Sequence, residues 1–169
     1  MTGLLGAVLA GGKSSRFGSD KAVALWEGKR LLDRSRALLA PWCDEVVVVG
    51  REGGVPDLPH PDLGPLGGIA GALDYAASHG YRCVLTISCD MPRLPDGLIE
   101  HLLRRGPSFC QDAPVLGHWS SALGAQLLSY LETGPDRSVK GWARSIGALP
   151  IASPEPLANV NTPEDLLAL

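Results

Sequence analysis

The sequence lacks the closely spaced cysteines that hold structural zinc or dense disulfide frameworks. Its 169 residues contain four cysteines, Cys43, Cys83, Cys89 and Cys110, and no two of them form a CxxC pair. Neither a zinc site nor a disulfide framework is therefore expected. We expect most of these thiols to pack as small hydrophobic side chains.

The sequence also lacks a large excess of either charge and a long hydrophobic run. Its formal net charge is −3 at pH 7, with 45% hydrophobic and 20% charged residues. This balance is typical of a globular protein that has no strong field for polyanions, so nucleic acid is not expected as a partner. The opening "MTGLLGAVLAGG" has no basic residues ahead of it and its apolar run is too short to span a bilayer. We expect a cytoplasmic protein without membrane contact.

The length fits one domain over residues 1–169. Three apolar, β-branched runs at 4–10, 45–50 and 82–88 are typical of strands buried on both faces. Helical spacing of apolar residues fills the intervals at 31–40 and 66–80. This alternation predicts an α/β fold, with right-handed crossovers and a doubly wound, mostly parallel sheet between two layers of helices.

The second half of the chain is less regular. Helical patterns occupy 94–106 and 136–147, and 113–132 indicates a strand that leads into a helix. A short strand is expected at 148–153, and the last helix should begin after Thr162, a good N-cap that Pro163 follows. The Gly/Pro-rich stretch 51–68 predicts a long loop, and loops of that length are usually functional or mobile.

Glycines and cations follow the first predicted strand in "LAGGKSSRFGSDKA", residues 9–22. Ligands of open α/β sheets bind beyond the carboxyl ends of the strands, where this loop must lie. Its glycines would let backbone N–H groups approach phosphate oxygens, and Lys13, Arg16 and Lys21 would add positive charge. The loop is neither a GxGxxG fingerprint nor a P-loop. A solvated basic turn is the alternative reading.

Three further motifs follow this loop: "HPDLGPLGGI" at 60–69, "CDMP" at 89–92 and "NVNTPEDL" at 159–166. In this order and spacing, the four motifs resemble the molybdenum cofactor guanylyltransferase family over nearly the whole chain. The resemblance implies a Rossmann-like nucleotidyltransferase fold of three α/β/α layers. It also implies transfer of GMP from GTP to the terminal phosphate of molybdopterin, with release of pyrophosphate.

The family's use of the first motif implies that the backbone of four residues wraps the nucleotide, namely Leu9, Ala10, Gly11 and Gly12. Arg16 would then grip the leaving pyrophosphate with its planar fork of donors. Lys21 would place a compact charge near the α-phosphate. Two exposed cations without a role remain the alternative.

Two aspartates carry the middle motifs. Asp90 follows an apolar strand, and the resemblance implies that its carboxylate holds Mg²⁺ and contacts the nucleotide, since hard oxygen ligands suit this ion. A helix cap or turn residue is the alternative. Asp62 is expected to contact the base at its N–H edge, where an acceptor-only carboxylate would favour guanine. Its alternative role is an Asx turn before Pro65.

The last motif places Asn159 and Asn161 two residues apart, so in an extended segment their side chains share one side. They would complete the metal's shell or orient the acceptor, or one of them would only cap the final helix. The resemblance thus implies a nucleotide-binding first half and an acceptor-binding second half. Proteins that donate or receive the cofactor would be its transient partners.

The sequence departs from the family at the end of the second predicted strand. A base-contacting asparagine carried by some members has no counterpart, because Gly50 and Arg51 stand there. This leaves open a related enzyme that uses CTP on molybdopterin, or another nucleotide on a sugar or alditol phosphate. A carrier that binds nucleotide or cofactor without catalysis is a third hypothesis. Trp119 and Trp142 are expected to pack rather than to stack on a pterin.

Overall fold

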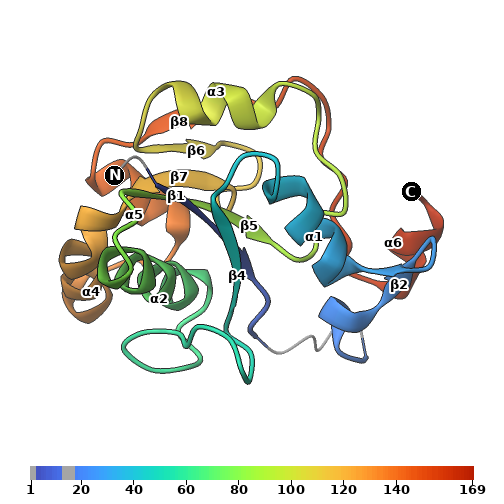
Figure 1. Cartoon of the computed structure of the whole chain (residues 1–169), viewed down its shortest axis with the longest axis horizontal. Coiled ribbons are helices and arrows are strands. Elements are labelled where there is room, and N and C mark those ends of the chain that lie inside the picture. The colour runs from blue at the N-terminus through green and yellow to red at the C-terminus, as the bar shows by residue number, and fades with distance from the viewer. Residues whose placement is uncertain (1–2, 13–17) are drawn as a thin grey trace.

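Strand β1, Leu4–Leu9, lies inside the sheet because its side chains are apolar on both faces. Leu5, Ala7 and Leu9 belong to one core cluster, whereas Val8 belongs to another. The computed structural model describes residues 3–12 and 18–169 (Figure 1). Successive side chains of β1 thus enter different clusters, so in this part of the chain the core has one layer on each face of the sheet.

The main sheet has six strands in the order β4-β1-β5-β7-β6-β8. The bounds of the other five are β4 Glu45–Val49, β5 Cys83–Ser88, β6 Ser108–Cys110, β7 Gly117–Ser120 and β8 Leu149–Ile151. Strand β1 pairs in parallel with β4 and β5, and β6 pairs in parallel with β8. Only β7 runs against its neighbours within this sheet of the described chain. The expected mostly parallel sheet is confirmed.

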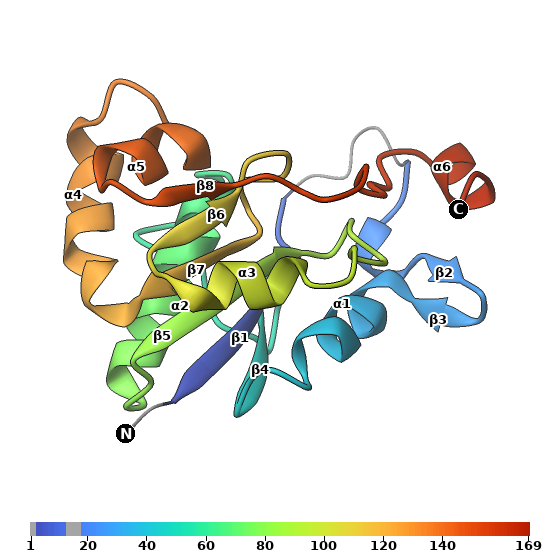
Figure 2. The same cartoon turned by 90° about the horizontal axis from the view of Figure 1, so that it is seen from above.

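Helices cover both faces of the sheet, as the doubly wound prediction requires (Figures 1 and 2). Helices α1, Leu31–Leu39, and α3, Leu98–Arg104, pack into the cluster on one face. Helices α2, Pro65–Ser78, α4, Gly124–Thr133, and α5, Val139–Ser145, pack into the other. The expected three-layer α/β/α arrangement is therefore confirmed.

A small module lies beside this core, where residues 21–30 meet the C-terminal helix (Figure 2). It contains the 3₁₀ turn η1, Lys21–Val23, the hairpin of β2, Leu25–Trp26, and β3, Lys29–Arg30, and the last helix, α6, Pro163–Leu167. Leu31 of α1 and Val160, which precedes α6, are fully buried, and Trp26 of the module packs against them. This module brings the C-terminal motif next to the first one.

Element boundaries differ from the expected ones where glycine and proline intervene. Helix α3 begins at Leu98 rather than at 94, because Pro95 and the left-handed Gly97, with φ of 77°, precede it. Helix α2 begins at Pro65, inside the stretch expected to be loop. The two-residue strands of the β2–β3 hairpin and the three-residue β6 were not expected, since such short strands carry no period.

The two tryptophans of the second half pack in the core, as expected. Trp119 and Trp142 are fully buried, and their ring centroids lie 4.8 Å apart. The indole N–H of Trp119 donates to Thr86 Oγ1 at 2.9 Å, and that of Trp142 donates to Gln126 Oε1 at 2.8 Å. Both rings are thus enclosed and their polar atoms satisfied, which leaves neither face open to a ligand.

Helix α2 packs against the preceding loop so closely that Gly71 has no room for a side chain. A Cβ at Gly71 would collide with the backbone oxygen of Pro56. We expect Gly71→Ala to lower the free energy of unfolding by about 1–3 kcal/mol, because backbone must shift to admit the methyl group. Urea denaturation followed by circular dichroism measures this change.

Gly124 at the start of α4 is the matched control, since its Cβ would meet only Leu73 Cβ at an ordinary 3.8 Å. We expect Gly124→Ala to be neutral or stabilising by up to about 1 kcal/mol, as alanine favours the helix. Equal stability of the two variants would contradict this description of the α2 contact.

Candidate functional site

Three strands end in one row at the carboxyl edge of the sheet. The register pairs Leu9 of β1 with Val49 of β4 and with Ser88 of β5. Two bonds just past the strands continue this alignment: Ala10 N–H donates to Val49 O at 3.0 Å, and Cys89 N–H donates to Leu9 O at 3.2 Å. The first motif and "CDMP" therefore leave the sheet side by side, as ligand-binding loops of open α/β sheets do.

A cavity of about 150 Å³ lies between this edge and the start of α2. Leu9, Val49 and Val115 give it an apolar wall, and Gly11 and Gly12 of the first motif line it as well. Three of the four residues expected to wrap a nucleotide thus face this cavity, whereas Ala10 is buried beside it in the core.

Glycines line this cavity where two segments of backbone approach each other closely. A Cβ on Gly50 would lie 2.8 Å from Gly11 Cα, so the two backbones approach too closely for a side chain. Gly50 has a φ of 84° and Gly12 a φ of 100°, conformations that other residues rarely adopt. Gly11 therefore allows the first motif to pack against the turn after β4, and Gly11 and Gly12 put no side chains into the cavity.

Two carboxylates line the cavity from the loop before α2. Asp62, expected from the sequence, is exposed at the rim, and its backbone has a left-handed φ of 68°. Asp57 was not expected. Its Oδ1 is buried, and no described residue donates a hydrogen bond to it. Burial, with a smaller contribution from Asp62, raises the pKa of Asp57.

The position of Asp57 is set by Val55, which forms a parallel bridge with Val49 at the edge of β4. Val55 N–H donates to Val48 O at 2.9 Å, and Gly50 N–H donates to Val55 O at 2.8 Å. This short pairing folds the loop back along the sheet and brings Asp57 to the cavity. In the sequence, the only signal was an isolated apolar residue inside a Gly/Pro-rich stretch.

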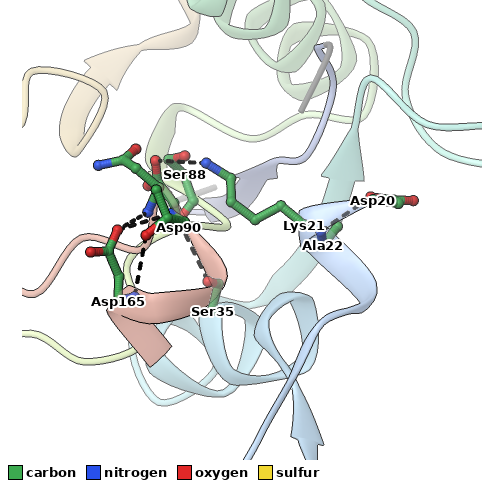
Figure 3. Close-up of polar contacts among 9 residues, drawn as sticks. Asp20, Lys21, Ala22, Ser35, Ser88, Asp90 and Asp165 are labelled. Carbon is green, nitrogen blue, oxygen red and sulfur yellow. Dashed lines mark hydrogen bonds and ion pairs between the residues drawn. The ribbon is translucent and has the colours of Figure 1, made fainter. Parts of the chain in front are cut away.

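Lys21 and Asp90 meet at the same edge, as their expected roles require (Figure 3). Lys21 Nζ lies 3.4 Å from Asp90 Oδ2, and their side chains are 19% and 22% exposed. Lys21 begins η1, whereas Asp90 follows β5 in a turn where Met91 N–H donates to Ser88 O at 3.4 Å. A cation and a carboxylate from distant motifs thus share one partly covered site.

The C-terminal motif runs beside Asp90. Val160 is fully buried, and its N–H donates to Asp90 O at 2.9 Å. Asn159 and Asn161 flank Val160 and are both exposed, as expected for alternate positions of an extended segment. The motif therefore brings two exposed amides next to the Asp90 turn.

The cap of α6 does not need either asparagine side chain. Thr162 Oγ1 accepts from Asp165 N–H at 3.3 Å, and Asp165 Oδ2 accepts from the N–H groups of Asn161 and Thr162 at 2.8 and 2.9 Å. This capping box confirms Thr162 as the N-cap. Helix capping thus does not account for the amide side chains of Asn159 and Asn161.

Asp90 provides one hard carboxylate for a divalent cation. The described residues contain no group of three or more His, Cys, Asp and Glu side chains that could hold a metal on their own. The carboxylate oxygens of Asp90 are hard ligands that suit Mg²⁺, which keeps several waters and takes further ligands from substrate phosphates. A protein site of one carboxylate, with nearby amides, suits an ion that arrives with a nucleotide.

Three further residues of the first motif and of "CDMP" were considered from the sequence. Arg16 and Lys13 lie outside the described residues. Cys89 is buried beside Asp90, and burial raises the pKa of its thiol to about 11, so it stays protonated at neutral pH. Its burial confirms that Cys89 packs in the core, as expected for most of these thiols. In the described part of the chain, no helix has the length and apolarity to cross a membrane.

Comparison with known proteins points to one family. A family model described as the MobA-like NTP transferase domain matches residues 6–140. The chain is 34% identical over 178 residues to the molybdenum cofactor guanylyltransferase of Rhodobacter capsulatus, and the alignment covers 96% of this chain and 93% of that protein.

Two solved structures share the fold. Molybdopterin-guanine dinucleotide biosynthesis protein A from Archaeoglobus fulgidus superimposes with a TM-score of 0.70 at 21% identity, covering 97% of this chain and 95% of that one. The 2-C-methyl-D-erythritol 4-phosphate cytidylyltransferase from Thermus thermophilus gives a TM-score of 0.67 at 15% identity, covering 96% and 95%. The expected nucleotidyltransferase fold is confirmed.

Asp57 should cost stability at neutral pH. Its pKa in the folded chain is raised above the ordinary 3.8, so the folded state holds this proton more tightly than the unfolded chain does. Stability therefore falls as pH rises from below 3.8 through the raised pKa. We expect Asp57→Asn to melt above the wild type at pH 7, with a smaller difference at pH 3.5, in thermal unfolding scans.

Asp74→Asn is the control, because Asp74 is exposed on the outer side of α2. Its melting temperature should follow that of the wild type at both pH values. A destabilised Asp57→Asn protein at pH 7 would show that this carboxylate is satisfied in solution rather than unpartnered.

Proposed function

The chain belongs to the MobA-like NTP transferase family, and from this premise we propose that it transfers GMP from GTP to the terminal phosphate of molybdopterin. The products would be molybdopterin guanine dinucleotide and pyrophosphate. The observation that carries the proposal is the meeting of Lys21 and Asp90, at 3.4 Å, beside a glycine-lined cavity at the carboxyl edge of the sheet. We also propose that the protein is cytoplasmic and that it contacts proteins which donate or receive the cofactor.

The cavity is proposed to hold the base. Guanine presents two adjacent N–H donors, on N1 and on the exocyclic amine, and a carboxylate is the acceptor that matches them. Asp62 was expected in this role, but Asp57 is the better candidate, since its Oδ1 is covered and has no partner among the described residues. Asp62 at the exposed rim would then support it.

The phosphates are proposed to lie along the first motif. Backbone N–H groups of Gly11 and Gly12 would approach them, and Lys21 would place its charge at the α-phosphate. Arg16 retains its expected role at the pyrophosphate.

The reaction exchanges one phosphoanhydride bond for another. An oxygen of the molybdopterin phosphate would bond to the α-phosphorus of GTP, and the bond from that phosphorus to the β-bridging oxygen would break, so pyrophosphate leaves with the electron pair. When bound, Mg²⁺ would neutralise phosphate charge. Asp90 would hold it, with Asn159 or Asn161 completing the shell or orienting the acceptor. The protein's own contribution is mainly positioning and electrostatics.

GTP should be the preferred donor. We expect GTP with Mg²⁺ to raise the melting temperature more than CTP, ATP or UTP does, because selective binding to the folded state stabilises it by mass action. Incubation with molybdopterin should yield the dinucleotide, detected by chromatography and mass spectrometry. Equal shifts with CTP and GTP would remove the base assignment and favour the cytidylyl alternative. Absence of product with every nucleotide, where a known guanylyltransferase is active, would reject the enzyme.

Removal of the charges at the Lys21–Asp90 site should affect turnover and not folding. We expect Asp90→Ala and Lys21→Ala each to lower kcat by about 10²-fold or more, since both act on charge that develops in the transition state. The melting temperatures should change little, because both side chains are partly exposed.

Asp74→Ala, on the outer side of α2, removes a carboxylate without touching the site and should keep wild-type turnover. A protein that binds nucleotide equally well in all forms and turns over in none would be a carrier, the third hypothesis from the sequence.

A further inference from the structure

Arg51 reaches from the turn after β4 to the end of the first motif. Its Nη1 donates to Asp20 Oδ1 at 2.9 Å, and its Nη2 donates to Asp20 Oδ2 at 2.5 Å. The Arg51 side chain is 29% exposed and that of Asp20 44% exposed. Such a two-bonded pair of guanidinium and carboxylate fixes direction as well as distance.

Asp20 connects this ion pair to Lys21. Its Oδ1 also accepts from Ala22 N–H at 3.1 Å and thereby caps η1, the turn whose first residue is Lys21 (Figure 3). Lys21 in turn reaches Asp90 after β5. One continuous series of contacts therefore joins the end of β4 to the end of β5, the two strands on either side of β1.

The backbone of Arg51 is well anchored. The preceding Gly50 packs against Gly11 and donates its N–H to Val55 O at 2.8 Å. Arg51 O accepts from Gly54 N–H at 3.0 Å. The arginine thus extends from a fixed turn on the sheet, whereas Asp20 and Lys21 lie on a short 3₁₀ turn outside it.

We propose that Arg51 is a positioning residue for nucleotidyl transfer, which holds Asp20 and η1 so that the Lys21 ammonium stays beside Asp90. Arg51 also neutralises a carboxylate next to the lysine that would meet an anionic triphosphate. The inference rests on the proposed function, and its test has one arm that needs no substrate.

The kinetic arm uses variants that separate the ion pair from the cap. In Asp20→Asn the amide oxygen can still cap η1, because asparagine is as good a cap as aspartate, but the charge is lost. We expect Asp20→Asn and Arg51→Ala each to lower kcat about threefold to tenfold, with KM for GTP within about twofold. The double variant should be no slower than the slower single variant, since both remove one contact.

Two further variants sharpen this arm. Arg51→Lys keeps the charge but not the two-bonded fork, so it should recover only part of the lost kcat. Arg30→Ala is the matched control: Arg30 makes a similar two-bonded pair with Asp33 at the start of α1, at 2.7 and 3.1 Å, outside this series of contacts. It should leave kcat at the wild-type value.

The substrate-free arm measures how firmly Lys21 is held. Reductive methylation with formaldehyde and cyanoborohydride, followed by peptide mass spectrometry, reports the reactivity of each lysine. Lys21 should be methylated about threefold or more faster in Asp20→Asn and Arg51→Ala than in the wild type or Arg30→Ala, because the released ammonium becomes more accessible. The reactivity of Lys29 and Lys140 should not change.

The outcomes separate the two claims. Faster methylation of Lys21 in a protein that forms no dinucleotide would support the positioning contact and reject the proposed function. Unchanged methylation and unchanged kcat would overturn the inference. A raised KM for GTP in Arg51→Ala alone, with Asp20→Asn unaffected, would also overturn it, because Arg51 would then bind the nucleotide directly.

Discussion

The site depends on the register of β1 with its two parallel neighbours. Leu9 pairs with both Val49 and Ser88, so three chains leave the sheet at one level. A shift of β4 or β5 by one residue would exchange the faces of its side chains and move the following loop away from this level. The contacts of Asp90 and Arg51 begin within two residues of this row, and the loop from Val55 brings Asp57 to it.

Among the described residues, charge at this edge forms two ion pairs, whereas Asp57 and Asp62 have no cationic partner. Lys21 faces Asp90, and Arg51 faces Asp20, so each of these carboxylates has a cationic partner. Asp57 has no such partner among the described residues, and burying its Oδ1 without a hydrogen bond lowers the stability of the fold. A ligand with two adjacent N–H donors would remove that cost, which links the least satisfied group of the site to the choice of base.

The sequence predicted the elements in which composition and period agree. The runs at 4–10, 45–50 and 82–88 are continuous and β-branched, and they became β1, β4 and β5. Thr162 combined a cap residue with a following proline and an acidic first turn, and the capping box formed there. The meeting of Lys21 with Asp90 followed from parallel strands that share one edge. Local pattern and tertiary structure coincide at each of these positions.

Other features depend on contacts that no local pattern encodes. The β2–β3 hairpin is held by packing against residues of the C-terminus, more than a hundred positions away in the sequence. Asp57 lines the cavity because Val55 pairs with the edge of β4 and folds the loop back along the sheet. The proposed role of Arg51 depends on the turn after β4 lying close to η1, which is about thirty positions away in the sequence. Such residues are identified once the loops have been placed in space.

A crystal structure with a non-hydrolysable GTP analogue and Mg²⁺ tests the central claim most directly, because it locates base and phosphates together. The account predicts guanine in the cavity before α2, with its N1–H and amine donating to Asp57. It predicts the α-phosphate at Lys21 and the ion on Asp90. A base bound outside this cavity, or phosphates directed away from Lys21 and Asp90, would contradict it.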